Sequence, residues 1–343
     1  MLISILFSLT TYLWTINFDL AKTSPMLSLL YDNYNIKQQL ETRVVEVARE
    51  AGKNFLPLKA AARPEDTTTV NHLPAARDKS SLLPTRASST DYELSVESGV
   101  AIDCSTGAVL FQKNGDHAKP IASISKLMTA LVFLEHNPGW ERVYQMREED
   151  RREGSKEYLA AGEKVKIKDL FYLSLVASGN TETVALVNST GLGLPGFVEK
   201  MNNKAAELGL ANTVFKDPVG LDQGNVSTAL EVAKLAQAAF AMNDIRQASI
   251  TKKHEFTTLS GNKITVDNTD KLLEEFAASP QISIVGGKTG YTDEAGGCLV
   301  SKFVNKAGKE IVSVVLGSPD RNSRFSETKG LVEWAYDSYS WPE

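Results

Sequence analysis

The sequence predicts a mixed α/β domain in which helices cover an antiparallel sheet made from both ends of the folded segment. Two groups of β-rich runs support this prediction, one at residues 100–111 and one at residues 282–316. Between them, residues 123–250 carry apolar side chains mostly at helical spacing. Strands, helices, strands and a closing helix therefore indicate one domain whose first and last strands share a sheet.

Composition limits the classes of protein to consider. The 343 residues are 42% hydrophobic and 23% charged, which excludes wholesale disorder. A net charge of −5, from 37 basic and 42 acidic residues, argues against binding nucleic acid through a general basic surface. The two cysteines and four histidines form no C-x-x-C or H-x-x-x-H pair, so we expect no metal site and no disulfide framework.

The N-terminal segment, residues 1–20, is predicted to be a hydrophobic signal or anchor. Its first 18 residues carry no charged side chain. This stretch is slightly shorter than the roughly 20 residues of a membrane-spanning helix, and no basic residue precedes it. We expect export or N-terminal anchoring to a membrane, with cleavage left open. A buried core helix is the alternative.

Residues 21–91 are predicted to be a helical spacer followed by a linker. Helical spacing of apolar residues extends from Met26 to Leu56, and the following stretch is rich in Ala, Pro, Ser and Thr. The domain itself is then expected over residues 92–343. Within it the strands are expected at Val100–Asp103, Ala108–Phe111, Ile282–Val285, Gly297–Val304 and Glu310–Leu316, and the closing helix at Arg324–Tyr339.

Three short motifs carry candidate chemistry: Ser123-Ile124-Ser125-Lys126, Ser178-Gly179-Asn180 and Lys288-Thr289-Gly290. Together they match the S-x-x-K, S-x-N and K-T-G set of penicillin-interacting serine enzymes. Each motif alone is weak, because S-x-x-K also occurs at Ser249, Ser260 and Ser326. Of these serines, however, only Ser123 opens a strongly apolar helix and is followed by separate S-x-N and K-T-G motifs.

Serine needs a nearby base to act as a nucleophile, and no histidine is placed as a triad member would be. Lys126 lies three residues after Ser123, so both fall on one face of a helix. Burial and a second cation, Lys288, would lower the pKa of Lys126 and leave its amine neutral. Ser178 and Asn180 would hydrogen-bond Lys126 and relay a proton. The other interpretation of Ser178-Gly179-Asn180 is a helix end with its glycine in a left-handed turn.

The K-T-G motif follows the apolar run ISIVGG, which predicts a strand. In a strand Lys288 and Gly290 point to one side and Thr289 to the other. Gly290 would leave room for a substrate backbone, so an extended peptide could bind as an added strand. A surface strand ending in a glycine turn fits the same string.

With these motifs in place, the segments KPIASISKLMTALV, LVASGNTETVALV and GGKTGYTDEAGGCLV resemble the D-alanyl-D-alanine carboxypeptidases, the low-molecular-mass penicillin-binding proteins of peptidase family S11. The resemblance extends from about Tyr92 to Trp334. It implies the serine β-lactamase/DD-peptidase fold and a cofactor-free serine enzyme on the outer side of a bacterial membrane. The implied substrates are peptidoglycan stem peptides ending in D-Ala-D-Ala, and β-lactam antibiotics would be covalent inhibitors.

The resemblance also implies a role for each matching residue. Ser123 would be the nucleophile and Lys126 the general base, with Ser178 and Asn180 assisting proton transfer. Lys288 and Thr289 would hold the substrate carboxylate, with Arg324 beside it, for which Arg321 is the alternative. Gly290 would complete the substrate-binding residues. The oxyanion hole would be the backbone N–H groups of Ser123 and Tyr291.

Other functions remain to be weighed. The sequence ends soon after the K-T-G motif, where many carboxypeptidases have a further β-rich domain, and shorter relatives include DD-endopeptidases that cut crosslinks. A non-catalytic wall-binding or penicillin-sensing protein is a second alternative. A β-lactamase is disfavoured, because Glu207–Asn212 is one residue too long for the E-x-x-L-N string that such enzymes need.

Cys104 and Cys298 are expected to be small buried residues, and whether they pair is left open.

Overall fold

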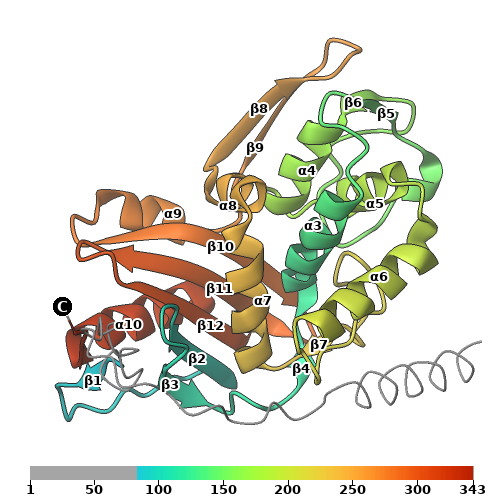
Figure 1. Ribbon diagram of the computed structural model, residues 1–343. Coiled ribbons are helices and arrows are strands. Elements are labelled where there is room, and N and C mark those ends of the chain that lie inside the picture. Colours follow the sequence, from blue (N-terminus) through green and yellow to red (C-terminus); the bar gives the residue numbers. More distant parts are fainter. Residues whose placement is uncertain (1–82, 343) are drawn as a thin grey trace, which may run out of the picture. The chain divides into compact units, whose positions relative to one another are not determined.

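The computed structural model describes residues 83–342 of the chain. Its centre is a five-stranded antiparallel sheet in the order β10-β11-β12-β2-β3. The strands are β2 (Ser98–Asp103), β3 (Val109–Lys113), β10 (Ile282–Thr292), β11 (Gly296–Asn305) and β12 (Glu310–Ser318). The first and last parts of the domain thus share one sheet, which confirms the predicted α/β architecture (Figure 1).

Helices pack on both faces of this sheet, and others pack around α3 beside it. The helices of the described residues are α3 (Lys126–Glu135), α4 (Ile167–Leu175), α5 (Asn180–Ser189), α6 (Gly193–Glu207), α7 (Ala229–Ala241), α8 (Asn243–Ile250), α9 (Leu272–Glu275) and α10 (Ser323–Ser338). Three 3-10 turns accompany them: η2 (Ala122–Ser125), η3 (Glu148–Asp150) and η4 (Phe276–Ala278). Figure 1 shows α7 in front of the sheet, where it contacts β11 and β12. α10 packs against β12 through one separate apolar cluster and against β11 through another.

The alternation of side chains along β12 explains these two layers. Val312, Val314 and Leu316 belong to the large core that includes α3 and α7. Ile311 and Val315 belong to the smaller core beneath α10. Because successive side chains of a strand point to opposite faces, an almost wholly apolar strand must be covered on both sides. The burial of every residue of β12 after Glu310 agrees with this.

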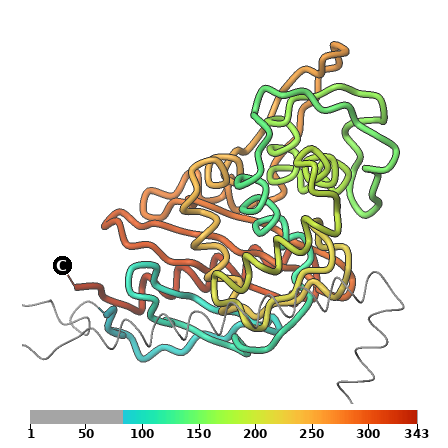
Figure 2. The backbone as a smooth tube through the Cα atoms, turned by 45° about the vertical axis from the view of Figure 1, so that its right-hand side comes forward, coloured from blue at the N-terminus to red at the C-terminus, as the bar shows by residue number. Residues whose placement is uncertain are grey.

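The segment 123–250 is mostly helical, as predicted, but it also contains short strands. β5 (Val143–Gln145) pairs with β6 (Lys164–Lys166), and β7 (Val226–Ser227) pairs with β4 (Lys119–Pro120), which precedes the segment. The sequence did not indicate these strands, because strands of two or three residues are too short to show a period. A further hairpin of β8 (Lys253–Thr257) and β9 (Lys263–Asp267) extends from the body beyond α8 (Figure 2).

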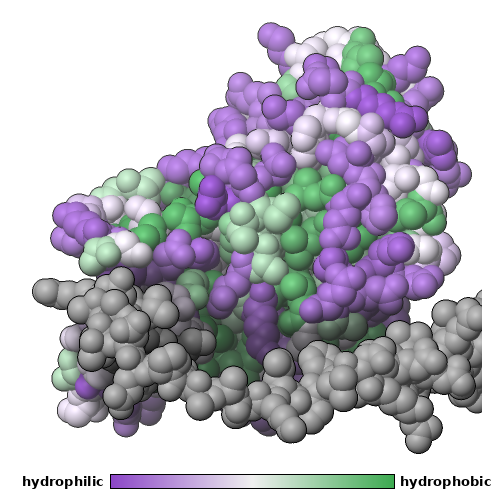
Figure 3. All heavy atoms as spheres, in the orientation of Figure 1, coloured by the Kyte–Doolittle hydropathy of each residue, from purple (hydrophilic) through white to green (hydrophobic). Residues whose placement is uncertain are grey.

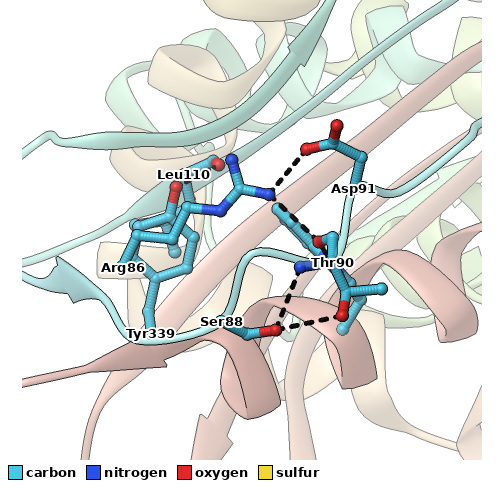
Figure 4. A network of polar contacts seen from close by, with 7 residues as sticks. Arg86, Ser88, Thr90, Asp91, Leu110 and Tyr339 are labelled. Carbon is cyan, nitrogen blue, oxygen red and sulfur yellow. Dashed lines mark hydrogen bonds and ion pairs between the residues drawn. The ribbon is translucent and has the colours of Figure 1, made fainter.

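The first described residues pack against the last ones. β1 (Thr85–Arg86) pairs with β13 (Tyr339–Ser340), although sequence composition assigns residues 85 and 86 to the linker. Arg86 donates hydrogen bonds to the carbonyl of Thr90 and to Asp91, and the Tyr339 hydroxyl donates to the carbonyl of Leu110 at 2.7 Å (Figure 4). The segment before Tyr92 is attached to the end of the domain by the β1–β13 pair and by the Trp334 indole, which donates to the carbonyl of Thr90 at 3.0 Å.

Two further expectations concern a membrane-anchoring segment and the pairing of the cysteines. No helix within residues 83–342 is both long and apolar enough to cross a membrane, and the predicted anchor at residues 1–20 lies outside the described part. Figure 3 shows apolar surface near the middle of one face, around α3, α7 and α8, with hydrophilic residues surrounding it. Cys104 and Cys298 are both free thiols, and Cys298 is fully buried.

Candidate active site

The three motifs meet at one end of α3. Ser123 lies in η2, Lys126 is the first residue of α3, and the Lys126 Nζ to Ser123 Oγ distance is 2.9 Å. Sequence analysis placed both residues in one α-helix, but Ser123 is in a 3-10 turn that precedes it. A 3-10 turn has three residues per turn, so side chains three apart eclipse each other. This geometry aligns the amine with the hydroxyl.

Lys126 is fully buried and its amine has three oxygen partners. Besides Ser123 Oγ, these are Asn180 Oδ1 and the carbonyl oxygen of Val219, each at 2.8 Å. Burial lowers the pKa of Lys126 to about 7, against the opposing effect of the acidic side chains Asp217 and Glu182. The neutral amine is therefore well populated near neutral pH.

Lys288 is also fully buried, on the facing strand β10. Its amine donates to Ser178 Oγ at 2.8 Å and to the carbonyl of Thr289 at 2.9 Å. Burial, followed by the charges of Lys126 and Arg324, holds the pKa of Lys288 well below its usual range. Burial and the charge of Lys288 were both expected to lower the pKa of Lys126. Burial does so, whereas the repulsion between the two lysines lowers the pKa of Lys288.

Ser178 differs from expectation in two respects. Its hydroxyl pairs with Lys288 and not with Lys126, so within this motif only Asn180 contacts the Lys126 amine. The left-handed residue after α4 is Ser178, with φ of 56°, whereas Gly179 is extended with φ of −60°. An L-residue held in this conformation is under local strain, which requires support from its surroundings.

The turn that carries Ser123 is packed tightly between two glycines. Ala122 has a φ of 46°, a second left-handed position occupied by a residue other than glycine. A Cβ on Gly220 would lie 2.0 Å from the carbonyl oxygen of Ala122, and a Cβ on Gly290 would lie 3.1 Å from the Ser123 nitrogen. Gly290 was expected to make room for substrate. The space at its missing side chain is occupied by the chain's own η2 turn.

Two arginines lie beside the K-T-G motif. Arg324, in the first turn of α10, is buried and donates from Nη1 to the carbonyl of Gly290 at 2.5 Å. Arg321 stacks its guanidinium over the Tyr291 ring at 4.0 Å from the centroid. Arg324 thus contacts the motif's backbone, whereas Arg321 covers the next side chain. Thr289 Oγ1 is 2.6 Å from Thr269 Oγ1.

Sequence reasoning missed the loop that supplies the Val219 carbonyl. Asp217 accepts hydrogen bonds from the backbone nitrogens of Val219 and Gly220, each at 2.6 Å. Asn225 binds the same loop and donates to Ser125 Oγ at 3.0 Å. Val219 contacts Lys126 through a backbone oxygen, which any residue type possesses. No sequence pattern could therefore have identified it.

The orientation of Asn180 is also determined by a backbone group. Its Nδ2 donates to the carbonyl of Glu153 at 2.8 Å, and its backbone nitrogen donates to Ser155 Oγ at 2.8 Å. Since the amide nitrogen is engaged by Glu153, the amide oxygen is directed toward Lys126. The loop of residues 151–158 therefore supports the site from outside the three motifs.

The helix-covered sheet and the serine–lysine pair place this protein among the penicillin-interacting serine enzymes. The model of the peptidase S11 family, described as D-alanyl-D-alanine carboxypeptidase, matches residues 84–320. The chain belongs to this family.

Relatives of both named activities are similar to the chain. D-alanyl-D-alanine carboxypeptidase DacF of Bacillus subtilis is 30% identical over 249 residues, covering 71% of this chain and 62% of that protein. D-alanyl-D-alanine endopeptidase of Escherichia coli is 32% identical over 256 residues, covering 73% of this chain and 81% of that protein. The crystal structure of the Streptomyces K15 DD-transpeptidase aligns with a TM-score of 0.67 at 27% identity, over 72% of this chain and 99% of that one.

Proposed function

We propose that this protein is a serine-type D-alanyl-D-alanine carboxypeptidase that removes the terminal D-Ala from peptidoglycan stem peptides through an acyl-enzyme on Ser123. The observation that carries the proposal is the 2.9 Å contact between Ser123 Oγ and the amine of a fully buried lysine, Lys126. Membership of the S11 family supports the substrate class. Peptidoglycan lies outside the cell membrane, so the domain would act there, with residues 1–20 as the export or anchor segment.

In the structure Lys126 donates to all three oxygens, and the Ser123 hydroxyl donates to the Val219 carbonyl at 3.3 Å. A neutral amine has two N–H bonds and one lone pair. The carbonyl oxygens of Asn180 and Val219 can only accept, so after loss of a proton they would keep the two N–H bonds and the lone pair would face Ser123 Oγ. Lys126 would thus accept the hydroxyl proton as Ser123 Oγ attacks the scissile carbonyl carbon.

Breaking the scissile C–N bond then requires a proton on the leaving amine. In our proposal Lys126 gives the proton that it took from Ser123 to this amine. Ser178, whose hydroxyl accepts a hydrogen bond from Lys288, assists the transfer. D-Ala leaves, and water hydrolyses the ester on Ser123. The charge on the carbonyl oxygen would be stabilised by the backbone N–H groups of Ser123 and Tyr291, each worth about 3 kcal/mol in such sites.

The terminal carboxylate would be bound on β10. Arg324, which donates to the carbonyl of Gly290, would supply positive charge, and Lys288 would gain a proton as the carboxylate binds; both side chains are buried. Charge-assisted hydrogen bonds are stronger in such an environment than in water. β-Lactams, which carry a carboxylate beside a reactive amide, would bind the same groups and acylate Ser123.

A DD-endopeptidase that cuts crosslinks is the second candidate. It is supported by the similarity to the Escherichia coli D-alanyl-D-alanine endopeptidase, which is 32% identical over 256 residues. Incubation of the protein with pentapeptide monomers and with crosslinked dimers, followed by mass analysis of the products, separates the two reactions. Release of D-Ala from monomers supports the carboxypeptidase, and cleavage of dimers alone supports the endopeptidase.

The nucleophile itself is tested with a fluorescent penicillin. Ser123→Ala should abolish covalent labelling while leaving the fold intact, because the acyl-enzyme requires the hydroxyl. Ser326→Ala, at another S-x-x-K match, is the control and should label normally. Labelling that persists in Ser123→Ala, or that disappears in Ser326→Ala, would refute the assignment.

A further inference from the structure

The loop of residues 151–158 has no helix or strand of its own and is held against the first turn of α5 by side chains of that turn. Thr181 Oγ1 accepts a hydrogen bond from the Arg152 nitrogen at 3.0 Å and donates to the Arg152 carbonyl at 3.2 Å. Glu182 accepts through Oε1 from the Tyr158 nitrogen at 2.9 Å. Neighbouring residues of one helix therefore fix both ends of the loop.

The middle of the same loop determines the orientation of Asn180, which is buried. The Glu153 carbonyl accepts from Asn180 Nδ2 and the Ser155 hydroxyl accepts from the Asn180 backbone nitrogen, each at 2.8 Å. With its nitrogen engaged in this way, the amide directs Oδ1 toward the Lys126 amine, also at 2.8 Å. A residue that keeps the loop in place therefore acts on Lys126 through Asn180.

Glu182 is an acidic side chain with no exposed surface. It is the third residue of α5, where the helix dipole favours a negative charge. Its Oε2 has no hydrogen-bond partner among residues 83–342, and a Cβ on Gly179 would lie 2.2 Å from this oxygen. Burial raises the pKa of Glu182, although backbone N–H groups oppose the shift. A buried carboxylate is unfavourable compared with an apolar side chain, so its presence between the loop and Ser178-Gly179-Asn180 requires a reason other than packing.

We propose that Glu182 is a positioning residue for the reaction at Ser123. Its carboxylate holds the loop of residues 151–158 against α5, the loop fixes the Asn180 amide, and Asn180 directs its oxygen to Lys126. The inference rests on the proposed function for the part that Lys126 plays. Because the bond to the Tyr158 nitrogen needs an acceptor oxygen at the right distance, the length of the side chain should decide its effect, and its charge should not.

Two variants separate length from charge. Glu182→Gln keeps the length and an acceptor oxygen but removes the charge, whereas Glu182→Asp keeps the charge and is shorter by one carbon–carbon bond, about 1.5 Å. Glu182→Gln should be acylated by a fluorescent penicillin at close to the wild-type rate. Glu182→Asp should be acylated at least about tenfold more slowly, since a displacement of about 1 Å can reduce a rate about a hundredfold.

These rates are compared at pH 9, above the pKa of Lys126, because Glu182 also raises that pKa and its neutralisation would shift the pH dependence. Wild-type rates in both variants, or a slow Glu182→Gln beside a normal Glu182→Asp, would overturn the proposal.

A double variant tests whether the effect passes through Asn180. Asn180→Ala should itself slow acylation, because Lys126 loses one of its oxygen partners. If Glu182 acts by orienting this amide, adding Glu182→Asp to Asn180→Ala should slow acylation no further. Losses that multiply in the double variant would mean that Glu182 acts independently of Asn180, which contradicts the proposal.

Asp103→Ala is the control for a general loss of stability. Asp103 is another fully buried carboxylate, and it accepts from the Trp341 indole at 2.7 Å. It pairs with Ile311 near the start of β12, whereas the K-T-G motif lies level with the other end of that strand. Asp103→Ala should unfold at a lower temperature and be acylated at the wild-type rate. Slowing equal to that of Glu182→Asp would overturn the proposal, because lost stability alone would then explain both.

Hydrogen exchange of the Asn180 side-chain amide, followed by NMR, separates this inference from the proposed function. The signal is identified by its absence in Asn180→Ala, and its exchange should be slow in the wild type and in Glu182→Gln but faster in Glu182→Asp. If penicillin does not acylate the wild type but exchange follows this order, the role of Glu182 stands and the reaction assignment fails. If the wild type is acylated and neither exchange nor rate differs among the three chains, the reaction assignment stands and the role of Glu182 fails.

Discussion

The amine of Lys126 lies where three oxygens converge, and two of these oxygens cannot donate a proton. Burial removes the water that would otherwise stabilise the charged amine. Burial therefore favours the neutral form, whereas the three acceptor oxygens by themselves would favour the charged amine. A lysine can therefore take the role that histidine has in a triad, because its surroundings shift its pKa by several units toward that of histidine.

The pH dependence of acylation tests this role. With a pKa of about 7, Lys126 is charged and inactive as a base below that pH and neutral above it. The rate of penicillin acylation should therefore rise with pH along a limb centred near 7. Lys126→Arg should lose most of the rate at every pH, because arginine stays charged. A limb centred near the ordinary lysine value of about 10.4, or an arginine variant with normal acylation, would exclude the role.

The two arginines beside β10 should differ in function. Arg324 donates to the carbonyl of Gly290, whereas Arg321 lies over the Tyr291 ring. Arg324→Ala should reduce the preference for a peptide with a free terminal carboxylate over its amide about tenfold, the effect of losing one charge-assisted hydrogen bond. Arg321→Ala should change this preference little. Steady-state kinetics on the acid and amide pair decides between them, and equal slowing of both peptides by Arg324→Ala would assign that residue a structural role.

At the scale of elements, the long strands and the closing helix could be predicted because their patterns are long. The predicted Glu310–Leu316 strand and Arg324–Tyr339 helix each differ from the observed β12 and α10 by at most two residues at either end. The short β5–β6 pair escaped detection, since three residues show no period. The 3-10 turn at Ser123 also escaped, because its geometry depends on glycines far away in the sequence.

Gly220 tests the packing of that turn. It has a φ of +85°, and a Cβ there would lie 2.0 Å from the carbonyl oxygen of Ala122. Gly220→Ala should therefore displace the Ser123 turn and nearly abolish penicillin acylation. Its cost in stability should exceed the roughly 1 kcal/mol of the left-handed conformation alone.

Gly308→Ala is the control, because Gly308 has a φ of +73° and nothing lies within 4 Å of a Cβ placed there. It should show only the conformational cost, with normal acylation. Thermal unfolding and penicillin labelling of both variants provide the comparison. Equal behaviour of the two variants would mean that close packing at Gly220 is unimportant.

At the scale of the whole molecule, the spacing of the motifs was sufficient to indicate which residues gather at the site. Each motif is short, and the order of the elements brings all three to one end of α3. The pairing within the site could not be predicted. Ser178 contacts Lys288 and not Lys126, because its left-handed backbone directs the side chain toward β10. Such pairings depend on tertiary packing between segments that are distant in the sequence, so local sequence patterns do not indicate them.

The buried lysines also affect the stability of the fold. A charged amine loses its hydration on folding, so Lys126 and Lys288 oppose folding at any pH where the unfolded chain carries them protonated. The active site is therefore a region where function is maintained against stability. The unfavourable contribution of the buried lysines to the free energy of folding depends on pH.

Lys126→Met makes that dependence measurable. The pKa of Lys126 is about 7 in the folded protein and about 10.4 in an unfolded chain. Between these values the unfolded state binds more protons at this residue, so the free energy of unfolding of the wild type rises with pH by up to about 1.4 kcal/mol per unit from this group. The methionine variant lacks this contribution. Urea unfolding at pH 7 and pH 9.5 should therefore show the wild type gaining stability relative to Lys126→Met as the pH increases. Lys200→Met, at an exposed site, should follow the wild type at both pH values. If the difference between wild type and Lys126→Met stays constant, the lysine is charged in the folded protein throughout, and it could not serve as the base.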